Sequence, residues 1–351
     1  MKLPETDLDH VLGHAPLLRE LRGGSVFLTG GTGFVGTWLV ESFVHANRVL
    51  DLKARITVLT RDADGYRLRA PHLASDPAVT VHTGNVRTFE YPEGEFPFAI
   101  HAATEPYRPP DRQSPLSVFE ADMEGTRRVL ELARQRGTRR FLFTSSGAVY
   151  GRQPAEMERM AEEYAGAPAA TDTDSAYGQS KRVSEWCSAM YGRVYGFTAT
   201  VARLFAFSGP LLPLDANYAI GNFVRDALNR GPIRIAGDGT PWRSYLYAAD
   251  LASWLWTILL GGASGRAYNV GSPEAVTIAE LAHAVAAHVA PGTAVEIARD
   301  PVPGARPARY VPDVERAARE LGLCPAIGLE EGIRRMAVWH RGAMPGGAKT
   351  A

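Results

Sequence analysis

The sequence has little cysteine, no excess of positive or negative charge and no long hydrophobic run. Its two cysteines, Cys187 and Cys324, cannot form a disulfide framework, and neither has a Cys or His nearby at metal-ligand spacing. We therefore expect two buried, unreactive thiols and no bound metal.

The charge balance excludes a second group of functions. Lys plus Arg and Asp plus Glu number 38 each in 351 residues, so no basic field is available to hold nucleic acid or an anionic membrane. No stretch reaches the roughly 18 apolar residues of a membrane span. Glu5, Asp7 and Asp9 stand where a signal peptide needs a basic start. We expect a cytoplasmic protein without a nucleic-acid or membrane partner.

The most informative feature is a glycine cluster between a strand-like run, residues 25–29, and a run with helical spacing of apolar residues. In such a turn Gly30 can adopt a positive φ, Gly33 lets backbone approach a bulky anion, and Gly36 lets the helix pack on the strand. The helix N-terminus above the loop favours a diphosphate. The cluster predicts dinucleotide binding, against the simpler alternative of a plain strand-to-helix turn.

The second predicted strand, residues 56–60, ends where this kind of fold places a group against the adenosine ribose. An acidic residue there would bind a free 2′-hydroxyl. The chain has Thr60 and Arg61 instead, which could hold a 2′-phosphate. We expect NAD or NADP as cofactor, with a weak preference for NADP; the alternative is that Arg61 is only a solvated loop residue.

Strands and helices alternate along the following part of the chain, which favours an α/β protein. Strands are predicted over residues 79–82, 98–103, 141–146 and 198–202, and helices over 117–135 and from 175 onward. Small Ala102 and Ala103 at a strand end leave room for a flat ring or a ribose at the ligand-binding edge. The acidic segment 152–173 is expected to form a solvent-facing helix and loop without a catalytic part.

Three residues carry the predicted chemistry. Tyr177 and Lys181 are four residues apart and therefore share one helical face, and Ser146 ends a strand at the same predicted sheet edge. A phenol has an ordinary pKa near ~10 and becomes a base only if positive charge, here Lys181 and an oxidised nicotinamide, lowers it. With Ser146 holding the substrate oxygen, this is a hydride-transfer site. Taken singly, each of the three residue types is more often structural.

Several motifs together resemble the extended short-chain dehydrogenase/reductases, and more narrowly the nucleotide-sugar epimerase/dehydratase group. They are the glycine loop from Thr29 to Gly36, Ser146 before Val149-Tyr150-Gly151, Tyr177-x-x-x-Lys181, Arg203-Leu204-Phe205 with Gly209-Pro210, Arg243 to Asp250, Asn269-Val270-Gly271 and Leu329 to Gly332. The resemblance covers nearly everything from Gly24 to Trp339 and does not specify a substrate.

The resemblance implies a Rossmann-type, doubly wound parallel sheet with a smaller C-terminal α/β lobe that clasps a nucleoside-diphosphate sugar, and a homodimer. It divides the chain into an N-terminal helical extension (1–23), the NAD(P)-binding domain (24–205, with return segments near 245–272), the substrate lobe (206–244 and 273–343) and a tail (344–351). The implied ligand contacts are Phe34 and Val35 along the dinucleotide diphosphate, Asn85 and Val86 near adenine, and Asn222, Arg243 and Arg306 or Arg309 on the substrate.

The chain departs from the group at three positions. Where 4,6-dehydratases carry Asp-Glu after the catalytic hydroxyl residue, it has Gly147-Ala148, and neither side chain can move a proton. A standard dehydratase is therefore disfavoured unless a glutamate from residues 152–173 reaches the site. Ala206 replaces the group's usual Asn, which puts one substrate hydrogen bond in doubt, and Asn85 replaces its adenine-side acid.

These residues predict a nucleotide-sugar 4-epimerase, in which Tyr177 takes the C4 hydroxyl proton and hydride leaves and returns through a transient 4-keto sugar. A 4,6-dehydratase with relocated acids and a keto-sugar reductase are the alternatives. Decarboxylation of a uronic acid sugar is a lesser one. A dinucleotide-binding protein without turnover is the remaining possibility from another class.

Overall fold

The computed structural model describes residues 2–104 and 115–343. The predicted tail, residues 344–351, lies outside this range.

A seven-stranded parallel sheet forms the centre of the molecule, in the order β11-β6-β5-β4-β1-β2-β3. The strands are β1 (Ser25–Thr29), β2 (Arg55–Thr60), β3 (Val79–Thr83), β4 (Phe98–His101), β5 (Arg140–Ser146), β6 (Thr198–Leu204) and β11 (Ala267–Val270). The order reverses between β1 and β4, which opens a crevice at the carboxyl ends of the strands. The predicted Rossmann-type α/β fold is confirmed.

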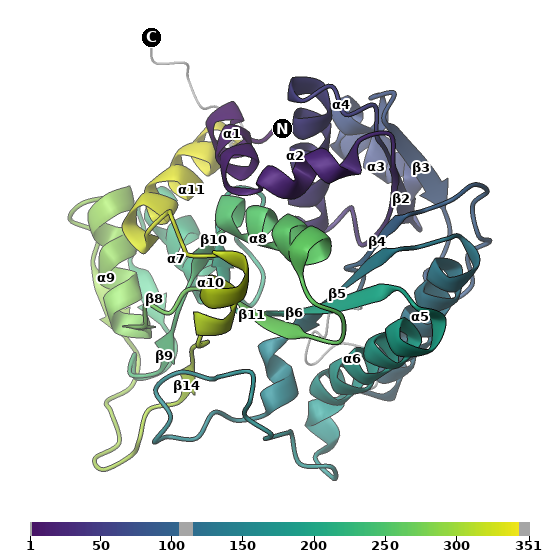
Figure 1. Ribbon diagram of the computed structural model, residues 1–351. Coiled ribbons are helices and arrows are strands. Elements are labelled where there is room, and N and C mark those ends of the chain that lie inside the picture. The colour runs from purple at the N-terminus through teal and green to yellow at the C-terminus, as the bar shows by residue number, and fades with distance from the viewer. Residues whose placement is uncertain (1, 105–114, 344–351) are drawn as a thin grey trace.

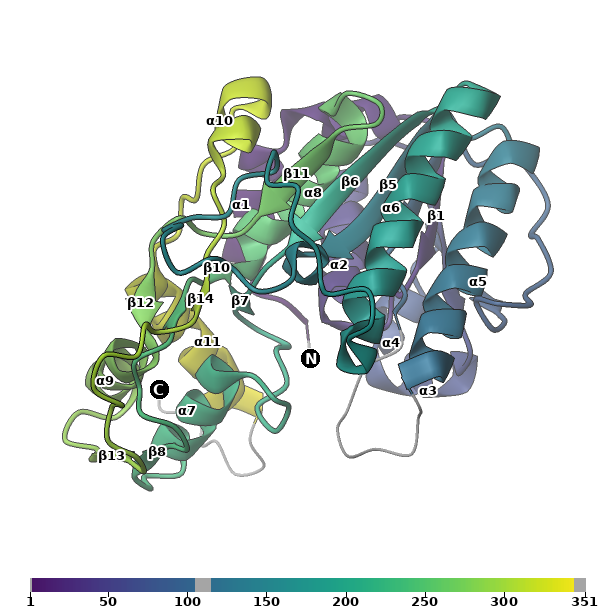
Figure 2. The same ribbon diagram turned by 90° about the horizontal axis from the view of Figure 1, so that it is seen from below.

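Helices cover both faces of the sheet (Figures 1 and 2). One face carries α5 (Pro115–Gln135) and α6 (Ala176–Tyr195), which pack on each other; α2 (Phe34–Val49) and α8 (Ala248–Gly261) cover the other. The first thirteen residues of α8 are all buried, since α1 (Glu5–His14) and η1 (Pro16–Leu21) cover it from outside. The short helices α3 (Ala63–Arg69) and α4 (Pro71–Ala74) lie between β2 and β3.

A second, smaller hydrophobic cluster forms outside the sheet layer, among helices that Figure 2 shows beside the sheet. It includes Ile220, Phe223, Val285, Ile333 and Met336. Its helices are α7 (Ala219–Leu228), α9 (Ile278–Val289) and α11 (Leu329–Ala343), with α10 (Glu315–Leu321) nearer the sheet. The short strands are β7 (Phe207–Ser208), β8 (Ile233–Ile235), β9 (Trp242–Arg243), β10 (Leu246–Tyr247), β12 (Val276–Thr277), β13 (Val295–Ile297) and β14 (Arg309–Tyr310). In these strands β9 pairs with both β12 and β14.

The first helix ties the two parts together. The Asp7 carboxylate is 1% exposed and accepts hydrogen bonds from the Tyr247 hydroxyl (2.6 Å) and from Arg335 of α11 (2.7 Å). One turn further, His10 contacts the buried Asp250 of α8 at 2.7 Å. The N-terminal segment is thus helical, as expected, and it also bonds to both the sheet layer and the smaller lobe.

The expected helix within residues 152–173 is wrong. The segment is a chain of turns with one β-bridge, from Met160 to Pro312, and only the short η3 (Thr173–Ser175) begins at its end. Its Glu162 side chain is 2% exposed and accepts the Asn269 N–H at 2.8 Å. Pro154 and Pro168 disfavour a continuous helix. The segment is therefore partly buried by specific polar contacts rather than solvent-facing throughout.

The two cysteines differ from each other. Cys187 is partly buried, and burial raises the pKa of its thiol. Cys324 is exposed, so the expectation of two buried thiols is wrong for this residue.

Candidate active site

The loop after β1 has the geometry of a phosphate cradle. Gly30 has φ +74°, and a Cβ there would stand 2.5 Å from the Ala102 carbonyl, so no other residue fits without strain. A Cβ on Gly36 would lie 2.1 Å from the Gly30 oxygen, which shows how closely α2 approaches the loop. Gly33 is the N-cap residue of α2 and has an extended backbone. No side chain among the described residues caps this helix, so the N–H groups of its first turn can donate to a ligand.

These features fit the diphosphate of a dinucleotide. Phe34 and Val35 are the first two residues of α2 and lie beside the cradle. The loop after β4 completes it: the Ala102 N–H donates to the Thr29 carbonyl at 3.2 Å, and the Ala103 N–H donates to the Thr29 hydroxyl at 3.2 Å. The two alanines therefore lie at the reversal point of the sheet.

The end of β2 holds Thr60, Arg61 and a carboxylate that already has a structural task. Asp62 accepts the Gly65 N–H at 2.8 Å as the cap of α3 and pairs with Arg69 at 3.2 Å. Both contacts lower the pKa of Asp62, and the hydrogen bond from the Gly65 N–H has the larger effect. Arg61 is exposed beside it. The carboxylate nearest this edge is thus directed into α3.

The predicted adenine contacts follow β3. The Asn85 side chain accepts the Arg87 N–H at 3.0 Å, and Val86 packs against Gly125 of α5, where a Cβ would stand 3.0 Å from its methyl. Both residues lie at the same sheet edge as the cradle, two strands from β1.

The three predicted catalytic residues converge at the ends of β5 and α6. Ser146 is the last residue of β5, and its Oγ accepts the Ala148 N–H at 3.1 Å. Tyr177 and Lys181 lie in the first two turns of α6, and the Lys181 Nζ is 5.6 Å from the centre of the Tyr177 ring. Lys181 is 2% exposed and donates to the Thr144 carbonyl at 3.3 Å.

Without a bound cofactor, the surroundings of Tyr177 favour its neutral, protonated form. Burial raises the pKa of Tyr177 to about 12, hydrogen bonding to Ser146 opposes this, and Asp122 and Tyr218 add to it. Burial also lowers the pKa of the Lys181 ammonium, while Asp122 and Glu185 act in the opposite direction. Further positive charge beside the phenol is therefore needed before Tyr177 can act as a base near neutral pH.

Two residues at this centre were missed by sequence reasoning. Asp122 of α5 is 4% exposed and accepts hydrogen bonds from the Thr104 (3.0 Å) and Ser180 (2.9 Å) hydroxyls, next to Lys181. Tyr310 of β14 brings its hydroxyl to the end of β5, where it interacts with Ser146. The sequence offered one sign of Asp122, an acidic residue on the face of the predicted helix 117–135 that turns toward the core. For Tyr310 there was only its position next to Arg309.

The predicted substrate residues are spread over the smaller lobe. In the parallel pair of β9 and β14, Arg243 stands opposite Tyr310 and Arg309 opposite Trp242, with the Arg309 guanidinium 4.8 Å from the Trp242 ring centre. Side chains alternate along a strand, so Arg243 shares the Tyr310 side and Arg309 points to the other. Arg306 is exposed in the preceding loop. With its amide turned so that oxygen and nitrogen both find partners, Asn222 of α7 donates to the carbonyls of Leu214 (2.8 Å) and Ala216 (3.0 Å).

The relocated-acid alternative depends on the glutamates of residues 152–173. Glu156, Glu158 and Glu163 are exposed, and Glu163 pairs with Arg316. Glu162 is buried, but its carboxylate contacts the Asn269 N–H and faces Arg316. These contacts hold Glu162 at β11 and α10, and none of them involves Ser146 or Tyr177.

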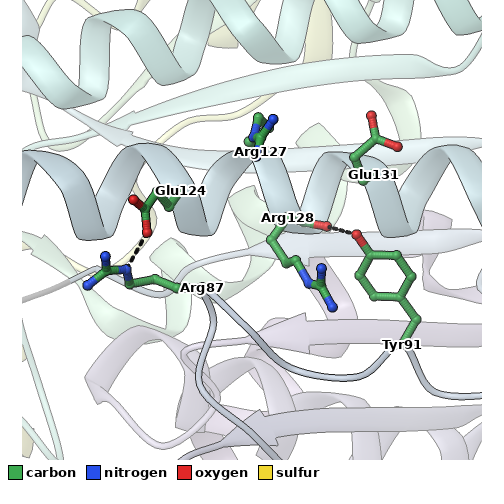
Figure 3. A pocket seen from close by; sticks show the side chains of 6 residues that line it. All are labelled: Arg87, Tyr91, Glu124, Arg127, Arg128 and Glu131. Carbon is green, nitrogen blue, oxygen red and sulfur yellow. Dashed lines mark hydrogen bonds and ion pairs between the residues drawn. The ribbon is translucent and has the colours of Figure 1, made fainter.

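A separate hollow lies on the outer side of α5 (Figure 3). Its lining residues are Arg87, Tyr91, Glu124, Arg127, Arg128 and Glu131. Arg87 pairs with Glu124 at 2.5 Å, and the Arg128 guanidinium stacks 4.4 Å from the centre of the Tyr91 ring. None of the predicted site residues lines it, and its internal ion pair joins Arg87 to Glu124, while Glu131 pairs with Arg134 outside the lining.

The described residues, 2–104 and 115–343, include no helix long and apolar enough to cross a bilayer. Within the same ranges, no three His, Cys, Asp or Glu side chains gather in a metal-binding arrangement.

Fold and site together define the class: a Rossmann-type α/β protein in which a dinucleotide cradle and a Ser-Tyr-Lys group share one edge of the sheet. Comparison with known proteins identifies the family. The chain belongs to the NAD dependent epimerase/dehydratase family, whose model matches residues 26–271. The family resemblance drawn from the motifs is thereby confirmed.

Curated relatives include UDP-glucuronic acid decarboxylase 1 of Arabidopsis thaliana, 29% identical over 89% of this chain and 68% of the relative. UDP-glucuronic acid decarboxylase 1 of Danio rerio is 26% identical over 95% of this chain and 77% of the relative. Among solved structures, UDP-glucose 4-epimerase of Thermus thermophilus in complex with NAD matches with a TM-score of 0.73 and 26% identity, over 91% of this chain and all (100%) of that one. UDP-glucose 4-epimerase of Thermotoga maritima with UDP-glucose has a TM-score of 0.74 at 19% identity, over 92% and 100%.

Proposed function

We propose that the protein is a nucleotide-sugar epimerase that acts at C4. The observation that carries this proposal is the meeting of Ser146, Tyr177 and Lys181 at the sheet edge beside the cradle, with Gly147-Ala148 in place of elimination acids. A bound nicotinamide supplies hydride exchange at the sugar carbon. The family and the two 4-epimerase structures support the proposal.

Each residue has a separate task in this reaction. Tyr177 removes the proton from the C4 hydroxyl and later returns it. Ser146 holds the same oxygen, and the serine is itself fixed by the Ala148 N–H. The Lys181 ammonium, locked under α6 by its bond to Thr144, provides positive charge that favours the ionised form of Tyr177.

The sugar nucleotide is expected to lie between the cradle edge and the smaller lobe. Arg243 is the arginine on the same strand face as Tyr310, so we propose it as the diphosphate ligand. Arg309, Arg306 and Asn222 remain weaker proposals, because Arg309 stacks on Trp242, Arg306 lies in an exposed loop and the Asn222 amide is used within its own lobe.

A second candidate is decarboxylation of a nucleotide uronic acid sugar, which the curated relatives favour. Oxidation at C4 places a ketone β to the C6 carboxylate, so carbon dioxide can leave and C5 then takes up a proton. Both reactions share the first step at Tyr177. A 4,6-dehydratase needs acids that residues 147 and 148 lack, and a one-way reductase would consume reduced cofactor.

Product analysis separates these reactions. Purified protein is incubated with UDP-glucose, UDP-galactose and UDP-glucuronate, and the products are identified by NMR. C4 inversion is the expected result. Carbon dioxide release from UDP-glucuronate would select the decarboxylase, a 4-keto-6-deoxy product the dehydratase, and steady loss of NADPH absorbance with a keto sugar the reductase. The dinucleotide-binding protein without catalysis is tested separately, because Tyr177→Phe would then leave the protein's cellular role untouched.

We also propose that the cofactor is NAD or NADP, with a weak preference for NADP. Thr60 and Arg61 end β2, while the nearby Asp62 carboxylate is engaged as the α3 cap and so contributes less repulsion toward a 2′-phosphate. Mass spectrometry of the denatured protein would identify any retained dinucleotide. Replacement of Arg61 by Ala should weaken NADP more than NAD; equal weakening would contradict the preference.

The proposed homodimer uses the outer face of α5 and α6. Leu116, Val183 and Trp186 are exposed there, and Trp186 is 63% exposed, which is unusual for a large apolar side chain. Light scattering of the wild-type protein and of Trp186→Glu tests this: the wild type should have twice the chain mass, and the variant one chain mass. A cytoplasmic location stays a prediction from the sequence.

A further inference from the structure

Tyr310 reaches the reaction centre from the other lobe. Its short strand β14 pairs with β9, and its hydroxyl donates to the Leu204 carbonyl at 3.5 Å. Leu204 stands opposite Ser146 in the pairing of β5 and β6, so the phenol lies over the carboxyl ends of these two strands. Its ring packs on Phe205 with centroids 4.7 Å apart, which fixes its orientation.

The phenol also explains why residue 147 is glycine. A Cβ at this position would stand 2.6 Å from the Tyr310 hydroxyl and 2.9 Å from the Phe205 ring. Any side chain on residue 147 would therefore displace Tyr310. The space next to the catalytic serine is filled by a hydroxyl from β14 instead of an acid from the loop.

Tyr310 keeps its proton. Burial raises the pKa of its phenol above the ordinary value, and interactions with Ser146 and the Gly147 N–H oppose this only in part. Tyr177 and Arg243 are the other titratable or charged groups beside it. The group therefore acts as a neutral hydrogen-bond donor rather than as a second base.

We propose that Tyr310 is a further catalytic residue, a phenol whose single O–H turns from the Leu204 carbonyl, which it reaches only at 3.5 Å, and donates to the same substrate oxygen that Ser146 holds and Tyr177 deprotonates. This inference depends on the proposed function. The oxygen gains negative character as its proton leaves for Tyr177, and a fixed neutral donor stabilises that charge without supplying a base for elimination at C5. The phenol thus assists the oxidation at C4 with which the proposed reaction begins.

The kinetic test compares Tyr310→Phe with Tyr268→Phe. Tyr268 is also buried, but it lies near the start of β11, away from the site, where its hydroxyl accepts from the Ala263 N–H and donates to Glu320. Tyr310→Phe should lower kcat by about tenfold, the value of one lost hydrogen bond, with KM little changed. Tyr268→Phe should leave both constants unchanged. An unchanged kcat, or a change in KM alone, in Tyr310→Phe would overturn the catalytic assignment.

A second measurement is independent of activity. Gly147→Ala is made in the wild-type and in the Tyr310→Ala background, and the Tm of all four proteins is measured. The drop caused by Gly147→Ala should be smaller when the phenol is absent; equal drops would refute the close approach of residues 147 and 310. If the wild type converts no nucleotide sugar, the proposed function and the substrate contact both fail, and the Tm values alone decide the position of the phenol.

Discussion

His101, the last residue of β4, should make the fold sensitive to mild acid. It is 1% exposed, with Nδ1 2.7 Å from the Thr29 hydroxyl and Nε2 3.1 Å from the Thr126 hydroxyl, so it joins β1, β4 and α5. Burial, with a smaller contribution from the Lys181 charge, lowers the pKa of His101 from its ordinary value of 6.5 to about 3. The folded protein therefore holds this ring neutral.

The direction and size of this pH dependence follow from the linkage between proton binding at His101 and folding. Between pH 6.5 and 3 the unfolded chain binds a proton at His101 that the folded chain does not bind, so the stabilising contribution is complete above pH 6.5 and is lost as the pH falls. At pH 5 the loss amounts to about 2 kcal/mol, and at pH 3 to about 4 kcal/mol. Few carboxylates titrate above pH 5. Burial also lowers the pKa of His340, which adds a loss of the same sign, so the His101 part is isolated by comparison with a His101 variant.

Urea denaturation at pH 7.5 and pH 5.0 measures the effect. Between the two pH values the free energy of unfolding should fall by about 2 kcal/mol more in the wild type than in His101→Gln. This difference does not depend on how far the substitution itself destabilises the protein at pH 7.5. His283→Gln is the matched control, because this side chain is exposed on α9 and should leave the pH dependence unchanged. Equal pH dependence in the wild type and His101→Gln would refute the reasoning.

Three further substitutions test other parts of the structure. Tyr177→Phe should lower kcat by at least about 100-fold while the Kd for the dinucleotide stays the same; retained turnover would remove Tyr177 as the base. Gly30→Ala forces a Cβ against the Ala102 carbonyl at φ +74° and should weaken dinucleotide binding in a fluorescence titration, and unchanged binding would contradict the tight turn. Glu185→Gln breaks the 2.7 Å ion pair with Arg203 and should cost about 3 kcal/mol in urea denaturation, a loss that would be absent if the pair were only a surface contact.

The sheet and the cradle were predictable because their signals are local. Each strand is a short apolar run, and the glycines after residue 29 have separate steric reasons within seven residues of chain. Tyr177 and Lys181 could be paired from helical spacing alone. The sequence therefore predicted the parts of the site that one strand, one loop or one helix turn determines.

The predictions that failed concern residues whose surroundings are set by contacts with residues far away in the sequence. Tyr310 reaches Ser146 from a two-residue strand that has no periodic signal of its own. Glu162 was assigned to solvent from the local density of acids, but Asn269 and Arg316, more than a hundred residues away, bury it. Such pairings are set by topology, and no single window of sequence contains both members.

The buried carboxylate of Asp7 has a consequence for the order of folding. Its partner Arg335 lies 328 residues further along the chain, so during synthesis the first helix waits for almost the whole protein before this contact can form. The contacts of α1 with Tyr247 and with Asp250 of α8 need less of the chain. The ion pair of Asp7 with Arg335 is therefore the last contact of α1 to become possible, and it joins the two lobes only after both have been synthesised.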